Sequence, residues 1–147
     1  MARLLDSDLT EESARRLNSS LGAGVIAFLP RTHCPLVESA RVVRYMQEQA
    51  AGQCGPCVFG LAELASHLES LAFDPASLRG RLPPILETCD LMDGRGACRH
   101  PDGVTRFVRS ALSVFTDEAK LHCRRGPCAL VGAPRFFPCP SPQDHGR

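Results

Sequence analysis

Apolar residues recur at helical spacing along most of the chain. Two unbroken segments, roughly 35–50 and 57–72, place apolar side chains on one face at a period of three to four residues. A third segment is interrupted by glycine and proline before it resumes over roughly 83–92, and a fourth runs over roughly 102–122. The pattern predicts four amphipathic helices. The apolar positions on their faces are Leu36, Ala40, Val43, Met46, Val58, Leu61, Leu64, Ala65, Leu68, Leu71, Ile85, Leu86, Cys89, Val104, Phe107, Val108, Ala111, Leu112 and Phe115.

The two ends of the chain follow other patterns. Residues 1–34 predict an extension with a short helix that begins near Thr10 and one strand in an apolar run that ends at a proline. No second strand pattern follows, so we expect Val25–Leu29 to pair with a strand of a partner or to pack as extended chain. Residues 124–147 are rich in proline, glycine and cysteine, which predicts a flexible tail. The helical region is therefore expected over residues 35–123.

Four helices joined by short loops predict an all-α fold, an up-down four-helix bundle with an N-terminal helix and strand extension and an irregular tail. We expect Asp102 to cap the fourth helix at its start. In such a bundle the loop after the first helix and the loop after the third helix lie at the same end. Residues far apart in the sequence are thereby brought together.

Composition and charge narrow the function classes. The 147 residues suit one domain with tails, and a hydrophobic content of 44% is enough for a core. A formal charge of +1 argues against binding nucleic acid, or an anionic membrane surface, through bulk charge. No apolar stretch has the form of a signal peptide or the length for direct membrane insertion. We therefore expect a cytoplasmic protein, in which eight cysteines stay reduced and indicate metal binding.

Three cysteines have the spacing of a metal site. Cys54 and Cys57 form a Cys-x-x-Cys pair in a loop bent by glycine and proline, directly after the first predicted helix. Cys98 lies 41 positions after Cys57, in the loop between the third and fourth predicted helices. Because both loops fall at one end of the predicted bundle, the three thiolates are expected to converge on one metal centre.

The wording of these loops resembles a known family. Gly24-Val25-Ile26, Cys34-Pro35 and the loop Ala51-Gly52-Gln53-Cys54-Gly55-Pro56-Cys57 are similar to the flavin-bearing NADH-oxidising subunit of respiratory complex I, in its C-terminal iron–sulfur region. The segment Gly94-Arg95-Gly96-Ala97-Cys98-Arg99-His100 resembles an actinobacterial branch of that family. The resemblance extends over roughly residues 20–123.

The resemblance implies a cofactor and a role. In the family, four cysteines hold a 4Fe–4S cluster at one end of a four-helix bundle. Cys54, Cys57 and Cys98 correspond to the second, third and fourth of these, whereas Ala51 stands where the first cysteine is found. The glycine-rich flavin- and NADH-binding domain of the family has no counterpart here. The resemblance therefore implies an iron–sulfur electron-transfer component of an oxidoreductase, which is not an enzyme on its own and works with a flavoprotein or another redox subunit.

The fourth ligand is open between two residues. His100 follows Cys98 closely, and Cys89 is the softer ligand near the correct end of the third helix. Cys123 and Cys128 are expected at the opposite end, because the fourth helix leads away from Cys98 for about 30 Å.

Two other functions fit the same residues. Three cysteines with His100 suit a structural zinc ion that stabilises the bundle. Alternatively, the chain is a metal-free structural or interaction subunit that uses Val25–Leu29 for strand addition to a partner.

Overall fold

The computed structural model describes residues 8–17, 27–76 and 82–137, and the regular secondary structure within them is helical throughout. The all-α class predicted from the sequence is confirmed. The α-helices are α1 (Glu11–Arg16), α2 (Pro35–Glu48), α3 (Leu61–Phe73), α4 (Pro83–Met92), α5 (His100–Val114) and α6 (Thr116–Arg125). A π-helical turn, η2 (Pro56–Gly60), precedes α3, and a 3₁₀ turn, η3 (Ala129–Gly132), follows α6.

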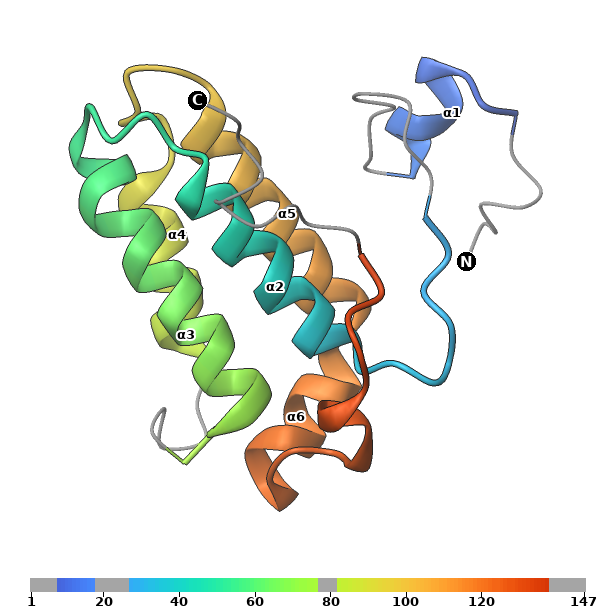
Figure 1. Ribbon diagram of the computed structural model, residues 1–147. Coiled ribbons are helices and arrows are strands. Elements are labelled where there is room, and N and C mark those ends of the chain that lie inside the picture. The colour runs from blue at the N-terminus through green and yellow to red at the C-terminus, as the bar shows by residue number, and fades with distance from the viewer. Residues whose placement is uncertain (1–7, 18–26, 77–81, 138–147) are drawn as a thin grey trace, which may run out of the picture.

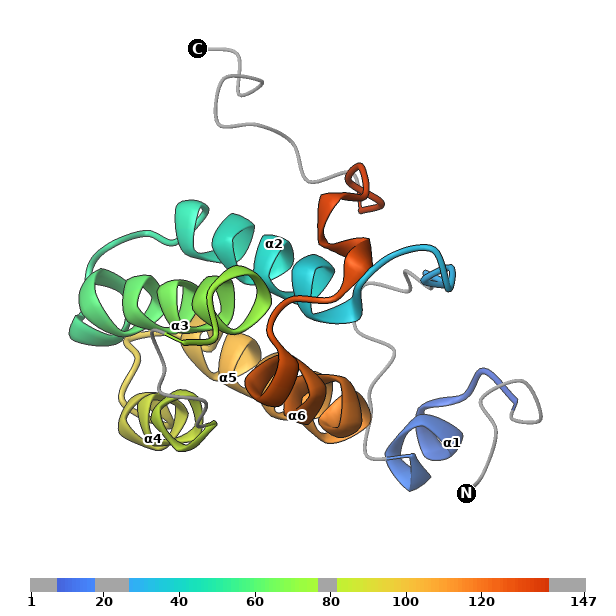
Figure 2. The same ribbon diagram turned by 90° about the horizontal axis from the view of Figure 1, so that it is seen from below.

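The helices α2, α3, α4 and α5 lie side by side and run alternately up and down (Figure 1). Helix α2 packs along α3, α3 contacts α4, α4 contacts α5, and α5 returns to α2. The loops 49–55 and 93–99 therefore lie at the same end of the molecule, as predicted. Helix α6 lies at the opposite end, where it contacts α2, α3 and α5 (Figure 2).

The core is formed by the predicted apolar faces. Its fully buried large side chains include Leu36, Val43, Leu61, Leu64, Leu68, Leu71, Ile85, Val104 and Val108. Val58 was expected on this face, but 47% of its surface is exposed. It lies within the π-helical turn η2, where the wider turn breaks the 3.6-residue periodicity that the prediction assumed.

The fourth predicted helix is two helices. Helix α5 ends at Val114 and α6 begins at Thr116, with a break at Phe115. The Thr116 hydroxyl donates to the carbonyls of Leu112 at 2.6 Å and Ser113 at 2.9 Å. Such bonds from a threonine to the preceding turn bend a helix, which apolar periodicity alone does not reveal.

The N-terminal extension agrees with the sequence in one element. Helix α1 starts after Thr10, whose hydroxyl accepts a hydrogen bond from the Ser13 N–H at 3.2 Å. Of the predicted strand, residues 24–26 lie outside the described residues, and residues 27–30 form no strand. Pairing through Val25–Leu29 therefore stays a prediction. None of the helices in the described part of the chain is long and apolar enough to span a membrane.

A buried ion pair holds the segment after α6 against α2. Glu38 is 1% exposed and is paired with Arg41 one turn further along α2. The Arg41 guanidinium also donates to the carbonyls of Ala133 at 3.2 Å and Pro134 at 3.3 Å. The Phe137 N–H donates to the Glu38 carboxylate at 3.2 Å. Residues 133–137 are thus bound to α2, while the predicted boundary between helical region and tail stays a prediction.

We predict that Arg41→Met lowers the free energy of unfolding by about 2 to 3 kcal/mol, because it leaves the Glu38 carboxylate buried without its cation. The matched control is Arg44→Met, which removes a half-exposed pair with Glu69 on the same helix and should cost less than about 1 kcal/mol. Urea denaturation measures both. Equal losses in the two variants would contradict the anchoring role of Arg41.

Candidate metal centre

Cys54 and Cys57 lie where the loop after α2 becomes helical. Cys54 is half-buried at the end of this loop, and Cys57 is buried in the first residues of η2. Pro56 begins η2, where its missing N–H costs nothing, and the Val58 N–H donates to the Cys54 carbonyl at 2.9 Å. The tight turn places the two thiols in hydrogen-bond contact with each other.

The loop of Cys98 contacts this pair directly. The Ala97 N–H and the Cys57 N–H donate to the Cys54 sulfur and lower the pKa of its thiol. Burial raises the pKa of Cys57, and the sulfurs of Cys54 and Cys98 add to the rise by charge repulsion, while the Gly52 N–H donates to the Cys57 sulfur. The structure therefore brings the three cysteines to one end of the helices, in mutual electrostatic contact.

Each loop turns at a glycine with left-handed backbone geometry. Gly52 has a φ of 66° and Gly94 a φ of 70°. Residues with a Cβ rarely adopt these values, so glycine is required for the direction in which each loop leaves its helix. The two turns stand immediately before the segments that carry Cys54 and Cys98.

Polar contacts fix the Cys98 loop to α5. The Gly94 N–H donates to the Asp102 carboxylate at 3.0 Å, and Thr105 donates its hydroxyl to Asp93. The Thr105 hydroxyl, followed by the guanidinium of Arg109 2.8 Å away, lowers the pKa of Asp93. Asp102 was expected to cap α5 and does not, because α5 already begins at residue 100. Its side chain closes the loop instead.

The two candidates for a fourth ligand have different surroundings. His100 is the first residue of α5 and is half-buried; its Nε2 is 2.9 Å from the Met46 carbonyl near the end of α2. A donating Nε2–H leaves Nδ1 with the free lone pair. Cys89 is fully buried within the core of α4, and burial raises the pKa of its thiol to about 11. Its charged neighbours are Asp90, Asp93 and Arg109.

A second cluster of potential ligands lies at the other end of the molecule. The ligand atoms of Cys34, Glu118, His122 and Cys128 all lie within 4.8 Å of one another. Sequence reasoning missed this cluster. Its one sequence signal is the Glu118-x-x-x-His122 spacing, which places two side chains on one helical face ahead of Cys128.

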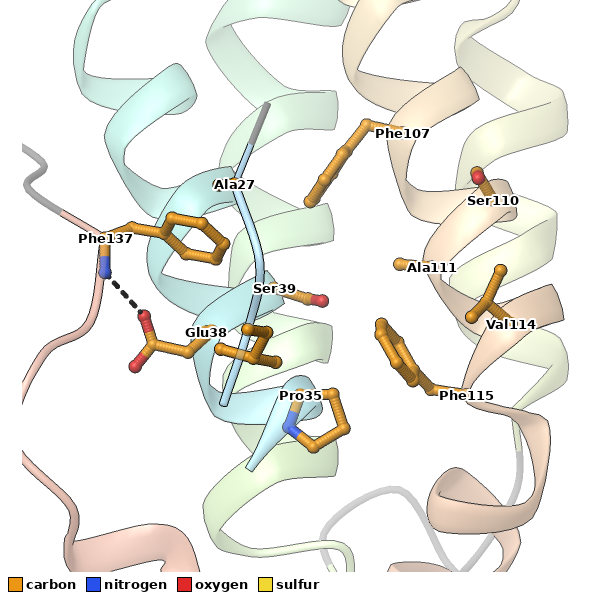
Figure 3. Close-up of a pocket in the computed structure, with 11 residues that line it drawn as sticks. Ala27, Pro35, Glu38, Ser39, Phe107, Ser110, Ala111, Val114, Phe115 and Phe137 are labelled. Atoms are coloured by element: carbon orange, nitrogen blue, oxygen red, sulfur yellow. Dashed lines mark hydrogen bonds between the residues drawn. The ribbon is translucent and has the colours of Figure 1, made fainter. Parts of the chain in front are cut away.

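The largest apolar pocket given for the described residues has little chemistry. It has a volume of about 240 Å³ between α2, α5 and the segments 27–29 and 137 (Figure 3). Glu38 is its one ionisable lining residue, and that carboxylate is already bonded to Arg41 and to the Phe137 N–H (Figure 3). The chemistry of the molecule is therefore concentrated in its cysteine clusters.

The helical packing and the thiols gathered at one end define a small iron–sulfur type of helical domain. The chain belongs to the family described as NADH-ubiquinone oxidoreductase-F iron-sulfur binding region, which matches residues 37–122, more than half of its length. The family expected from the sequence and its 4Fe–4S cofactor are thereby confirmed.

A relative from Rhizobium meliloti (strain 1021), a protein of the NADH-quinone oxidoreductase, is 23% identical over 124 residues. The alignment covers 84% of this chain but 29% of the relative. No solved structure shows a significant match.

We predict that Gly96→Ala displaces the Cys98 loop. A Cβ at residue 96 would lie 2.8 Å from the Cys98 carbonyl oxygen and 3.0 Å from the Pro101 ring. Because ligand positions must be held to about 0.5 Å, iron bound per chain should fall about twofold or more.

The matched control is Gly103→Ala in α5, where a Cβ meets nothing within 4 Å. It should keep its iron and gain up to about 1 kcal/mol of helix stability. Iron analysis and thermal unfolding measure both variants, and an unchanged iron content in Gly96→Ala would contradict the close fit of this loop.

Proposed function

We propose that Cys54, Cys57 and Cys98 hold the 4Fe–4S cluster and that the domain relays electrons between a flavoprotein partner and another carrier. The observation that carries the proposal is the contact between the two cysteine loops, where the Ala97 N–H donates to the Cys54 sulfur. Backbone N–H groups aimed at cysteine sulfurs stabilise thiolates and help to set the potential of a bound cluster.

The spacing of the three thiols favours a cluster over a single zinc ion. A tetrahedral zinc ion places its ligand atoms roughly 3.3 to 3.8 Å apart. Among the described residues, one set has all its ligand atoms within 4.8 Å, and Cys54, Cys57 and Cys98 do not belong to it. Ligands of a four-iron cubane stand further apart, because each binds a different iron.

The position of the site suits electron transfer. Cys98 is exposed and Cys54 is half-buried, so a cluster held there would have one edge near the surface. A one-electron carrier needs such an edge, and the cluster itself would supply the reversible one-electron chemistry. Membership in an oxidoreductase family supports redox subunits as partners. The cytoplasmic location expected from the sequence stays a prediction.

The proposal predicts the metal content of cysteine variants. Anaerobically purified protein should be brown and carry about four iron and four sulfide per chain. Cys54→Ala, Cys57→Ala and Cys98→Ala should each lose most of both, whereas Cys123→Ala, a control on α6, should retain them. Iron and sulfide analysis with EPR of the reduced protein measures this.

Full iron content in all three variants would overturn the ligand assignment. Colourless wild-type protein, with zinc or without metal, would overturn the electron-transfer role and favour the structural or interaction subunit.

Ala51 allows a test by gain of a ligand. It is exposed in the loop before Cys54, so Ala51→Cys adds a thiol without disturbing the core. Because this is the position of the family's first cysteine, the variant should lose its absorbance in air at least about tenfold more slowly than the wild type.

His100→Ala and Cys89→Ala, each made in the wild type and in the Ala51→Cys variant, then identify the wild-type fourth ligand. Substitution of the true ligand should lower cluster retention in the wild-type background and leave the Ala51→Cys background nearly unaffected. No effect of either substitution would assign the fourth iron to an exogenous ligand.

A further inference from the structure

We propose that Cys34, Glu118, His122 and Cys128 bind one zinc ion at the end of the molecule opposite to the Cys54 loop. The four residues come from three segments: Cys34 directly precedes α2, Glu118 and His122 are one turn apart on α6, and Cys128 precedes η3. Their ligand atoms lie within 4.8 Å of one another, and Cys34 and His122 are buried.

The distances match a single tetrahedral ion. The His122 Nε2 is 3.7 Å from the Cys34 sulfur and 3.4 Å from a Glu118 carboxylate oxygen. Zinc bonds of about 2.0 to 2.3 Å in tetrahedral geometry place ligand atoms roughly 3.3 to 3.8 Å apart. The side chains therefore already surround a point at which one ion fits, and they are too close together for a four-iron cubane.

The orientation of His122 is set by a bond behind it. Its Nδ1 is 3.2 Å from the Leu71 carbonyl of α3, so Nδ1–H donates to that oxygen. Nε2 then carries the lone pair and faces the two cysteines. A histidine whose far nitrogen donates to a backbone carbonyl is the usual arrangement in zinc sites, because the bond fixes both the tautomer and the ring angle.

The groups around Nε2 require a cation. The Cys128 N–H donates to Nε2 at 3.2 Å, which agrees with a lone pair on that nitrogen. The same lone pair faces the Glu118 carboxylate, also an acceptor. Two acceptors in contact in a buried site repel each other unless a positive charge lies between them. A metal ion meets this need, and its binding requires the Cys128 N–H to release Nε2.

The ligand types select zinc. Two thiols, one imidazole and one carboxylate form a mixed set with borderline softness, which zinc accepts in four-coordinate sites. Burial and contact with the Cys128 thiol raise the pKa of Cys34 to about 11, so the ion-free site holds thiols. Binding of Zn²⁺ would release one proton each from Cys34 and Cys128, while Glu118 and His122 bind in the forms they already have.

This site is separate from the Cys54 centre, and the inference does not depend on the function proposed above. Cys34 stands before α2 and Cys54 after it, and 14 helical residues span about 21 Å. Zinc at this end would connect the start of α2, α6 and the segment that leads to η3. Its role would be structural, because all four positions are filled by protein ligands.

The test titrates reduced, chelator-treated full-length protein with Co²⁺ and then with Zn²⁺. The wild type should bind one cobalt ion at this site with the intense visible absorption of tetrahedral thiolate coordination, and zinc should displace it. To exclude absorption from a cluster, the titration is run in the Cys57→Ala background, which leaves this end intact. Zinc and iron are also measured separately in protein as purified.

Cys34→Ser and Cys128→Ser should each weaken zinc binding by at least about tenfold and remove the thiolate absorption. Cys123→Ser, next to His122 but outside the set, is the matched control and should bind like the parent. Zinc should raise the thermal midpoint of the parent and of the control, but not of Cys128→Ser, whose substitution in a connecting segment leaves the helices unaltered.

Three results would overturn the proposal. The first is a weak octahedral cobalt spectrum in the Cys57→Ala parent. The second is unchanged zinc affinity in both serine variants. The third is a Cys34–Cys128 disulfide in protein prepared anaerobically, which would identify the pair as a covalent cross-link.

Discussion

The packing of α2 along α3 is the constraint on which the rest of the structure depends. The two helices share the largest part of the core, and α2 keeps a cysteine at each of its ends: Cys34 before it, Cys54 in the loop after it. Because a helix is a rigid spacer, its length holds the two thiol clusters apart. Helix α5 then joins both ends, since His100 contacts Met46 near the end of α2 and α5 leads into α6.

The two cysteine clusters differ in what surrounds their sulfurs. At the Cys54 end, backbone N–H groups of Gly52, Cys57 and Ala97 point at sulfur. They favour the anionic form of a ligand without introducing another ligand atom. At the Cys34 end the neighbours are an imidazole nitrogen and a carboxylate, which are ligand atoms themselves. One end is therefore suited to a large inorganic cluster, and the other to a small cation.

Much of the fold could be predicted from the sequence, because amphipathic periodicity reports burial directly. The faces of α2, α3 and α5 contain the core residues that their spacing indicates, and the joint location of Cys54, Cys57 and Cys98 followed from helix order alone. Val58 and the break at Phe115 could not be predicted, since a π-helical turn and a threonine bond to the preceding turn leave no periodic signal. The cluster around His122 was missed for a related reason. It depends on the course of the chain after Arg125, which proline and glycine content describes only as irregular.

The anchoring of residues 133–137 by Glu38 and Arg41 has a consequence for Cys128. This cysteine lies on a connecting segment fixed at both ends, by α6 on one side and by α2 on the other. Such a segment has already lost most of its conformational entropy when the chain folds, before any ion arrives. Most of the ordering cost of presenting a thiol next to His122 is then part of folding rather than of binding. The ion pair on α2 thus acts at a distance as a device for preorganisation, and the affinity of that thiol for a cation is coupled to the stability of the whole domain.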